Sequence, residues 1–516
     1  MDVISGFVLA PVGLTLILAS FLIFLLFRKY SKKYDCWKKM GVPYIKPYPV
    51  LGSMLDIYGK LLHEVEVQRY KKYGPLYGHF VGAYTMLTVG DPEHLRNILV
   101  KDFHIFSNRR AFKTGDVIFE SMLQMLQGED WKRVRSIVSP TFTTGKIKRV
   151  SVNTFTTLNC DKIFGTFSMD VIANAAFSTQ IDSHSDPNNE FVKMARSVFQ
   201  RNAPIRILIY LLFPGFMKFF KISVASQKSQ NFFSEITKNI IEERKRTGET
   251  RNDFLQLLIE AADEQIKEEK DTEKTDDILK NYEAETNEAV FKNFKPKKSL
   301  STTELVAQCV IFFLAGFETS ASTLAFACYQ LALNPDIQDR LVEELDDAIR
   351  TENGELSYET IQNLKYLDNV ISETMRLSPP SVRLERVAGE DYKLGDTGIV
   401  IPKDTVVSVP VYAIQRDPKY FPDPEKFDPE RFSPEERAKR SPYTFMPFGA
   451  GPRNCVAMRF ALVEVKVCLA YVLSHFKIKR CPETKVPLDF MKGQGLLQPK
   501  DVTVLLETRE TCLLKN

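Results

Sequence analysis

Apolar side chains recur at helical spacing along most of the chain after about residue 55. Leu341, Leu345 and Ile349 share one helix face at this spacing, and the run 462–472 repeats the pattern. Runs of strand type are fewer: they are 76–90, with Gly82 at its turn, and 406–413. The pattern predicts a mainly α fold with small β-sheets.

The segment 7–27 is apolar and carries no charge. A helix of this length, rising about 1.5 Å per residue, crosses the roughly 30 Å hydrocarbon layer of a bilayer. The segment lacks the shorter apolar core and the small-residue cleavage site of a secretory signal peptide. Only Asp2 precedes it, whereas basic residues follow it at Arg28, Lys29, Lys32, Lys33, Lys38 and Lys39. Residues 1–30 are therefore expected to form a transmembrane signal anchor whose basic flank keeps the body in the cytosol; a buried core helix is the alternative.

Three further segments differ in composition from the helical body. Residues 31–53 contain several prolines, which favour an extended linker before a domain that spans 54–516. Residues 263–298 form a charged tract that is expected to be a mobile loop. Residues 199–224 are apolar and aromatic with interspersed Arg and Lys, which fits either a buried helix pair or a loop at the bilayer surface.

Composition and charge narrow the class of protein. The chain has 516 residues, 44% of them hydrophobic, which suffices for a large globular core. Its 69 basic and 65 acidic residues leave a net charge of +4, too small for a protein whose main partner is nucleic acid. Eight cysteines are scattered, with no C-x-x-C pair and no zinc-type His spacing. This distribution is typical of free thiols in a reduced compartment.

One cysteine lies in a setting that indicates chemistry. The run FMPFGAGPRNCVAMRFAL (445–462) places Cys455 between a loop rich in Gly and Pro and a helix-like run. Amide groups at a helix N-terminus favour the thiolate, which is the form of cysteine that binds metals. Glycines let a loop backbone approach a flat partner closely. An isolated cysteine is usually a buried inert thiol, but this context favours a thiolate presented to a large ligand.

A second run, IFFLAGFETSAS (311–322), is an apolar helix interrupted by Glu318, Thr319 and Ser320. A carboxylate beside a hydroxyl in an apolar helix is suited to proton relay, and the small residues Ala315 and Gly316 leave a groove for a planar partner. The alternative is structural, because Thr in a core helix often bonds only its own backbone.

A third run, ETMR (373–376), places Glu373 and Arg376 on one helix face. A surface pair of this kind contributes under about 1 kcal/mol. A buried pair needs further hydrogen-bond partners, and Arg431 in PERF (429–432) is a candidate. The spacing alone fits both readings.

Taken in order along the chain, these segments resemble the cytochrome P450 superfamily, from the anchor to the C-terminus. FGAGPRNC resembles its haem-binding loop, AGFETS its oxygen-activating helix, ETMR its Glu-x-x-Arg helix, and PERF the meander that packs on that helix. The resemblance implies a triangular, mainly helical fold with haem b (iron protoporphyrin IX) as cofactor. It also makes Cys455 the proximal ligand of the haem iron, whose thiolate favours O–O cleavage.

The sequences of two segments, EDWKRVRSIVSPTFT (129–143) and RLSPPSVRLERVA (376–388), are similar to those of the xenobiotic-metabolising family 3 branch. On this similarity, the residues expected to hold the haem propionates are Arg109, Trp131, Arg135, Arg386 and Arg453. The alternative for each arginine is a surface charge. Further haem contacts are expected from Ala315 and Phe448. Substrate contacts are expected from Phe312, Phe313 and the segments 109–125, 199–224 and 493–499.

By the same resemblance the protein is a monooxygenase of the endoplasmic reticulum membrane that inserts one oxygen atom from O2 into lipophilic substrates. Glu318 and Thr319 are then expected to deliver protons. The sequence has no hydride site or flavin fingerprint, so electrons are expected from NADPH through a separate reductase. Cytochrome b5 is a further candidate partner.

Two features depart from the family pattern. Ala457 stands where the family usually has glycine, and 148–164 is shorter than the matching region by about one helix. They leave open a haem binder with impaired catalysis. The other alternative is a haem-thiolate isomerase or dehydratase that needs no reductase. Glu318 and Thr319 argue against it, because such enzymes do not need proton delivery to oxygen.

Overall fold

The structure is a computed structural model that describes most of the chain from residue 33 onward, together with Ser20, Phe21 and Arg28. The described ranges are 33–49, 51–82, 84–142, 158–178, 189–197, 203–223, 226–251, 253–262, 300–492 and 495–514. Apart from those three residues, the expected anchor at 1–30 lies outside the described residues. So do the charged tract 263–298 and most of the short region 148–164.

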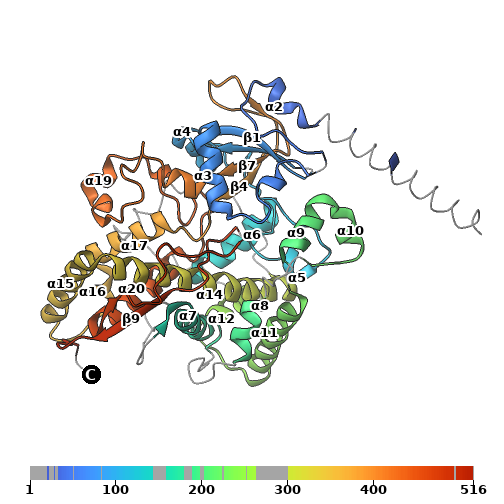
Figure 1. Cartoon of the computed structure of the whole chain (residues 1–516). Coiled ribbons are helices and arrows are strands. Elements are labelled where there is room, and N and C mark those ends of the chain that lie inside the picture. The colour runs from blue at the N-terminus through green and yellow to red at the C-terminus, as the bar shows by residue number, and fades with distance from the viewer. Residues whose placement is uncertain are drawn as a thin grey trace, which may run out of the picture.

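A four-stranded sheet lies at the top of the molecule in Figure 1. Its strands follow the order β1 (Leu76–Val81), β2 (Tyr84–Val89), β7 (Val406–Val409) and β4 (Leu384–Val387). The β2–β7 pair is parallel, and the other two pairs are antiparallel. β1 and β2 form the predicted hairpin. The strand predicted at 406–413 is wrong in its second half, because Pro410 has no N–H for a ladder and the short helix α18 (Val411–Ile414) follows it.

The proline-containing segment before this sheet packs against it and does not stand apart as a linker. Trp37, in α2 (Cys36–Lys39), is fully buried, and a Cβ on Gly78 would lie 2.3 Å from its ring. The backbone N–H of Ile45 donates to Gly78 O (3.0 Å), and that of Gly78 donates to Pro43 O (2.8 Å). The segment is extended, as its prolines predict, but it belongs to the globular body.

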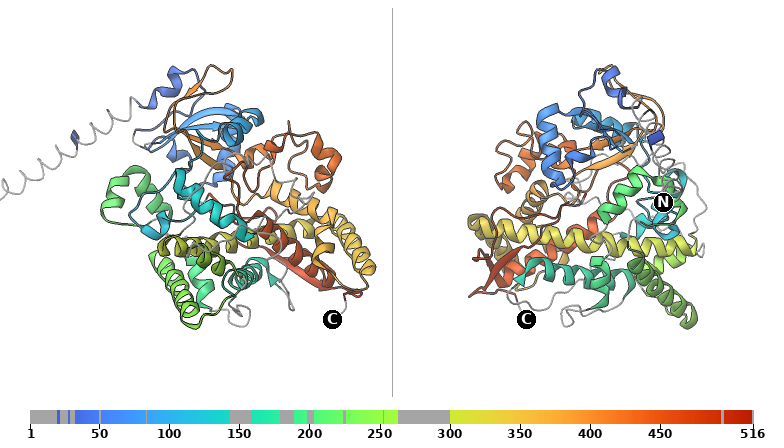
Figure 2. Two further views of the ribbon diagram at one scale, coloured as in Figure 1. Left: turned by 180° about the vertical axis from the view of Figure 1, so that it is seen from behind. Right: turned by 45° about the vertical axis from the view of Figure 1, so that its right-hand side comes forward.

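Helices form the larger part of the body, and the longest described one, α14 (Thr302–Leu333), crosses it in Figures 1 and 2. Helix α7 (Cys160–Phe177) lies against α14. Gly316 lies at this contact, where a Cβ would come 2.6 Å from Ile172 Cδ1 and would require the isoleucine side chain to shift. The other long helices are α3 (Leu62–Tyr73), α6 (Gly128–Val138), α9 (Ala203–Leu212), α11 (Gln227–Thr247), α12 (Phe254–Ala262), α15 (Pro335–Thr351), α17 (Lys365–Leu377) and α20 (Met458–His475).

Helix α14 is apolar on most of its surface. Ser301 and Glu304 begin it as a capping box, in which each side chain bonds the other residue's backbone N–H. Within the described residues it is the one helix that is long and apolar enough to cross a membrane. However, 67% of its apolar stretch is buried inside the body. It is packed as a core helix.

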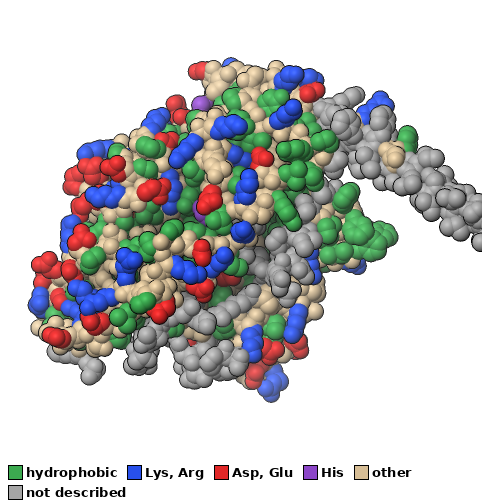
Figure 3. All heavy atoms as spheres, viewed as in Figure 1, with side chains coloured by type: hydrophobic (Ala, Val, Ile, Leu, Met, Phe, Trp, Pro, Cys, Tyr) green, Lys and Arg blue, Asp and Glu red, His purple; other side chains and the backbone are tan. Residues whose placement is uncertain are grey.

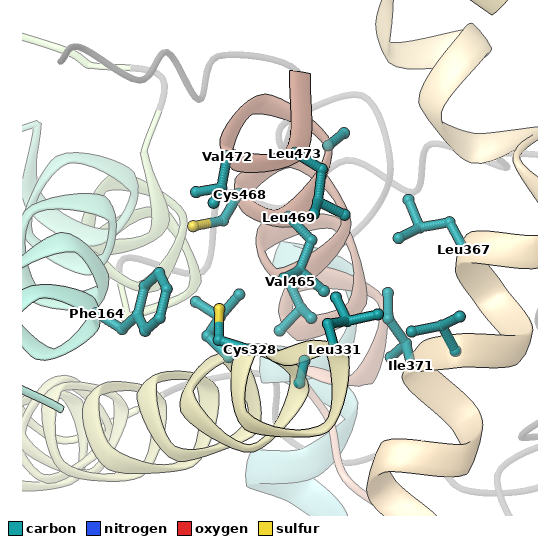
Figure 4. Packing of buried hydrophobic residues seen from close by; sticks show 14 of the residues in the cluster. Phe164, Cys328, Leu331, Leu367, Ile371, Val465, Cys468, Leu469, Val472 and Leu473 are labelled. Carbon is teal, nitrogen blue, oxygen red and sulfur yellow. The ribbon is translucent and has the colours of Figure 1, made fainter. Parts of the chain in front are cut away.

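The main hydrophobic core lies where α14, α17, α20 and α7 meet. Figure 4 shows Cys328 of α14, Ile371 of α17, Leu469 of α20 and Phe164 of α7 around this interior. The helical patterns predicted from Leu341 to Ile349 and over 462–472 are confirmed as the buried faces of α15 and α20. This core holds α14 and α20 at a fixed separation, and both reach the cavity described below.

The remaining elements are short. The segment 199–224 contains α9 and α10 (Pro214–Phe219), so it includes a helix pair. A second sheet has the order β3 (Leu158–Asn159), β9 (Thr503–Thr508), β8 (Phe476–Lys479), and β5 (Tyr392–Lys393) pairs with β6 (Val400–Ile401). The other short helices are α4 (Pro92–Arg96), α5 (Val117–Glu120), α8 (Glu190–Ser197), α16 (Tyr358–Gln362) and α19 (Pro434–Ala438). The predicted class, mainly α with small β-sheets, is confirmed.

Candidate active site

A cavity of about 410 Å³ lies between α14, α7, α6 and the loop that precedes α20. Its wall is mostly apolar. Cys455 and Phe448 of the loop line it, together with Thr319 and Phe312 of α14 and Arg135 of α6. Residues that are far apart in the sequence therefore meet around one cavity.

The loop before Cys455 is shaped by two glycines with left-handed backbone, Gly449 (φ 80°) and Gly451 (φ 72°). A Cβ on Gly451 would lie 1.9 Å from Leu99 O, so only glycine fits there. The glycines of this loop predict room for a flat partner, but Gly451 makes room for the backbone of Leu99 instead. The backbone N–H of Cys455 donates to Phe448 O (2.8 Å), which closes the loop.

Cys455 lies just before α20, and Ala457 is the N-cap of that helix. The thiol lies in the interior of the protein, where it is exposed to the cavity. Burial raises the pKa of Cys455, whereas a hydrogen bond from the Ala457 N–H and the nearby Arg135 and Arg109 lower it. Ala457 has φ −97°, which is not the left-handed conformation that favours glycine, and its backbone N–H donates to the Cys455 sulfur.

Three arginines, Arg109, Arg135 and Arg453, line one side of the cavity together with Trp131. Arg109 Nη2 donates to Arg453 O (2.7 Å). Arg135 donates to Asn454 O (2.9 Å) and to Asn454 Oδ1 (2.8 Å). The Arg453 guanidinium lies 4.3 Å from the centre of the Trp131 ring, at cation–π distance. These contacts fix the arginines to the loop that carries Cys455.

This wall is strongly cationic. Burial, followed by repulsion from Arg109, Arg386 and Arg135, lowers the pKa of Arg453 to about 8. Among the described residues, Nε and Nη1 of Arg453 have no hydrogen-bond partner. Buried donors without partners are costly, so the wall suits a ligand that brings anionic groups.

Arg386, the other predicted arginine, is fully buried on β4 and is not among the residues that line the cavity. Its Nη2 donates weakly to Ala450 O (3.4 Å), and Nε has no partner among the described residues. Burial, followed by Arg109, places its pKa well below the ordinary value. It lies behind the loop, not on the cavity surface.

The α14 wall carries the predicted acid and alcohol. Thr319 Oγ1 donates to Ala315 O (2.7 Å), which is the bond to its own helix backbone expected of a purely structural threonine. Thr319 and Ala315 nevertheless both line the cavity. Glu318 does not line it; its Oε2 accepts a hydrogen bond from Gln498 Nε2 (2.5 Å) beside a small adjoining pocket. Both residues line the small pocket, but of the two only Thr319 also lines the large cavity.

Sequence reasoning missed Glu464, and it named Gln498 only as part of the segment 493–499 expected at the substrate. Ser320, next to Thr319, lines the cavity and donates to Oε2 of the buried Glu464 (2.8 Å). Burial raises the pKa of Glu464 to about 7. The signal for Glu464 was a carboxyl group in the apolar pattern of α20, whereas nothing in the sequence around Gln498 indicates its contact with Glu318.

The two phenylalanines expected at the substrate differ in position. Phe312 lines the cavity, but Phe313 is not among the lining residues. The Phe313 ring stacks on Phe177 (4.5 Å between centroids) and on Phe233 (4.8 Å) in the core. Of the expected segments, 109–125 and 493–499 contribute lining residues, and the described part of 199–224 contributes none.

The third motif is a buried network. Glu373 and Arg376 lie on α17 with fully buried side chains. Arg431, in the short helix 429–432, lies with Nε 3.6 Å from Glu373 Oε1. The buried reading of the spacing therefore applies, with Arg431 as a member of the network.

Comparisons with known proteins agree with this arrangement. A family model described as Cytochrome P450 matches residues 42–506. Cytochrome P450 3A13 of Mus musculus is 37% identical over 530 residues, which cover 98% of each chain. Cytochrome P450 3A7 of Homo sapiens is 35% identical over 520 residues, 96% of this chain and 97% of the relative. The chain therefore belongs to the cytochrome P450 family, and it is a haem-dependent monooxygenase.

Proposed function

We propose that this protein inserts one oxygen atom from O2 into lipophilic foreign compounds at a membrane, with electrons from an NADPH-dependent reductase. The observation that carries the proposal is that one apolar cavity brings together the Cys455 thiol, the Thr319 hydroxyl and three arginines. Thiolate ligation, proton delivery and anchoring of an anionic cofactor need these three kinds of group.

The residues present fit haem. Cys455 is the single thiol on the cavity surface among the described residues, and it is suited to hold the iron. Arg109, Arg135 and Arg453, with unpartnered donors on Arg453, suit the two propionates. Arg386 adds positive charge from behind this wall, without lining the cavity. Trp131 orients Arg453 through the contact between its ring and the guanidinium group. When bound, haem supplies the activation of O2.

Thr319 and Glu318 are the groups proposed to move protons. Thr319 presents its hydroxyl oxygen to the cavity while its hydrogen bonds Ala315 O. Glu318 lies one residue away at the adjoining small pocket, where it can exchange protons with water. Phe312, Ala315 and Phe448 supply flat or small apolar surface beside them, which excludes bulk water and suits lipophilic substrates.

Membrane attachment is proposed from two features, an apolar N-terminal segment and an aromatic patch on α10. The apolar segment 7–27 is long enough to span a bilayer. On and beside α10, Phe216, Phe219 and Phe220 are 51%, 80% and 57% exposed, with Lys218 and Lys221 among them. Figure 3 shows this apolar patch projecting from the body over α10. Aromatic side chains with basic neighbours are typical of a surface that enters the bilayer interface. The endoplasmic reticulum is the compartment that we propose.

The redox partner is proposed to be an NADPH-dependent reductase, with cytochrome b5 as a second donor. Reconstitution tests this directly: the full chain, reductase and a lipophilic probe such as testosterone should consume NADPH and release a hydroxylated product. Cys455→Ser should abolish both. Product formation from a peroxide substrate without reductase would instead favour the isomerase or dehydratase.

The alternative of an impaired haem binder rested on Ala457 and the short region. The φ of −97° at Ala457 and its amide hydrogen bond to the Cys455 sulfur argue against damage at the first of these. Helix α7, which begins within the short region, also packs against α14. These observations favour a working enzyme.

A further inference from the structure

A hydrogen bond joins the C-terminal loop 495–499 to the proposed proton donor. Gln498 Nε2 donates to Glu318 Oε2 at 2.5 Å. A hydrogen bond to a carboxylate is stronger than one between neutral groups, and it fixes the direction of the carboxylate. Thr319, the neighbour of Glu318, points its hydrogen at Ala315 O instead (2.7 Å).

The loop presents Gln498 from a fixed backbone. Leu497 N–H donates to Pro380 O (3.0 Å), Val382 N–H donates to Gly495 O (3.2 Å), and Met491 N–H donates to Gln498 O (2.9 Å). The Leu497 side chain is 3% exposed and packs in a small hydrophobic cluster with Val382. Because the backbone on both sides of Gln498 is held, its amide reaches Glu318 from one defined position.

A second, small pocket lies at this contact. Its volume is about 10 Å³, and its polar wall consists of Glu318, Thr319, Ser322 and Gln498. A space of this size corresponds to about one water molecule, and a buried water needs two to four polar partners. Thr319 and Leu496 line both this pocket and the large cavity, so the two spaces adjoin.

We propose that Gln498 is a positioning residue that holds the Glu318 carboxyl group beside a single water in this small pocket. The Glu318 carboxylate first takes up a proton from solvent and passes it to that water, which gives a proton to the Thr319 oxygen. The Thr319 hydrogen then leaves Ala315 O, to which it is bonded at rest, and is released toward the large cavity. After the transfer Glu318 is again a carboxylate. This inference rests on the proposed role of Glu318.

The test uses the full-length holoenzyme in three variants. Gln498→Leu keeps the size of the side chain but removes the donor, Glu318→Gln identifies the carboxyl group, and Lys500→Ala is a control on an exposed residue of the same stretch. The carboxylate bands that Glu318→Gln removes from the infrared spectrum should shift in Gln498→Leu and stay in place in Lys500→Ala. Unchanged bands in Gln498→Leu would overturn the contact.

Coupling, the fraction of NADPH electrons recovered in product, is the second readout. Gln498→Leu should lower it by about tenfold, as for loss of a hydrogen bond to a charged group, and should enlarge the solvent isotope effect. Substrate affinity and the reduced carbon-monoxide spectrum should be unchanged. If the bands shift but coupling falls only in Glu318→Gln, Gln498 is not a positioning residue. If Glu318→Gln itself keeps full coupling, the proposed role of Glu318 fails, even where the infrared shift supports the contact.

Discussion

Glu373 and Arg376 form a doubly hydrogen-bonded ion pair in which neither side chain is reached by solvent. Arg376 Nε lies 2.6 Å from Glu373 Oε2, and Nη2 lies 2.8 Å from Oε1. Arg376 Nη1 also donates to Gln415 O (2.8 Å), and the Asp428 N–H donates to Glu373 Oε1 (2.9 Å). The pair thus connects α17 to two loops that lead toward the Cys455 loop.

Arg376→Met should therefore destabilise the protein strongly. It leaves the Glu373 charge buried without its partner, which typically costs about 3–5 kcal/mol. The yield of soluble, haem-containing protein should collapse. Arg350→Ala, which breaks an exposed ion pair with Asp347, should leave the yield unchanged; equal yields from the two variants would show that the buried pair is dispensable.

Arg453→Met should weaken the retention of haem without destabilising the haem-free protein. Burial and three neighbouring arginines lower the pKa of Arg453, because they make its positive charge unfavourable when no anion is bound nearby. In the proposed haem site it would donate charge-assisted hydrogen bonds to a propionate, and their loss should accelerate transfer of haem to an acceptor protein by about tenfold or more. The exposed Arg340→Met is the control. An unaltered transfer rate would remove Arg453 from the haem seat.

Stability should depend on pH through Glu464. Its pKa is raised from 4.5 to about 7 in the folded chain, mainly by burial. Between these values the folded state keeps a proton that the unfolded state releases, so stability falls as pH rises through that window and levels off above it. The loss amounts to roughly 3 kcal/mol. Glu464→Gln should flatten this part of the profile in urea unfolding; the same slope in both proteins would contradict the assignment.

Thr319→Ala should uncouple electron use from product formation, because it removes the hydroxyl from the cavity wall. NADPH consumption should continue while the product yield falls and hydrogen peroxide rises. Thr319→Ser keeps the hydroxyl and should restore most of the yield. Full coupling in Thr319→Ala would refute the proton-relay role.

The aromatic patch on α10 should enter the bilayer interface. A tryptophan placed by Phe219→Trp should be quenched by brominated lipids in vesicles that carry the full chain, because this side chain is 80% exposed beside basic residues. Tryptophan in place of Val486, which is also exposed, is the comparison. Equal quenching at both positions would contradict a membrane role for α10.

Sequence patterns predicted the fold well where a periodic apolar face decides the structure. The faces of α15 and α20 and the hairpin of β1 and β2 were foreseen, because each buries one side against a core. The strand predicted at 406–413 was wrong in its second half, because Pro410 ends the strand although the residues after it are apolar. The segment with the prolines near residue 45 was expected to stand apart, but the close fit of Trp37 on Gly78 depends on tertiary contact, which local composition does not encode.

The motifs predicted those site residues that lie within them. Cys455, Thr319, Arg135 and Arg453 meet at one cavity. Phe313 could not be separated from Phe312 by pattern, because one helical step decides which ring faces the cavity. The contact of Gln498 with Glu318 was not foreseen, because it joins residues that are 180 positions apart in the sequence. Such contacts arise from packing and leave no local signal.

The most direct measurement is the absorption spectrum of the reduced, carbon-monoxide-treated protein, for the native chain and for Cys455→Ser. The account predicts a strongly red-shifted Soret band in the native chain, the mark of thiolate ligation, and its loss in the variant. A band typical of a neutral ligand in the native protein, or an identical red-shifted band in Cys455→Ser, would contradict it.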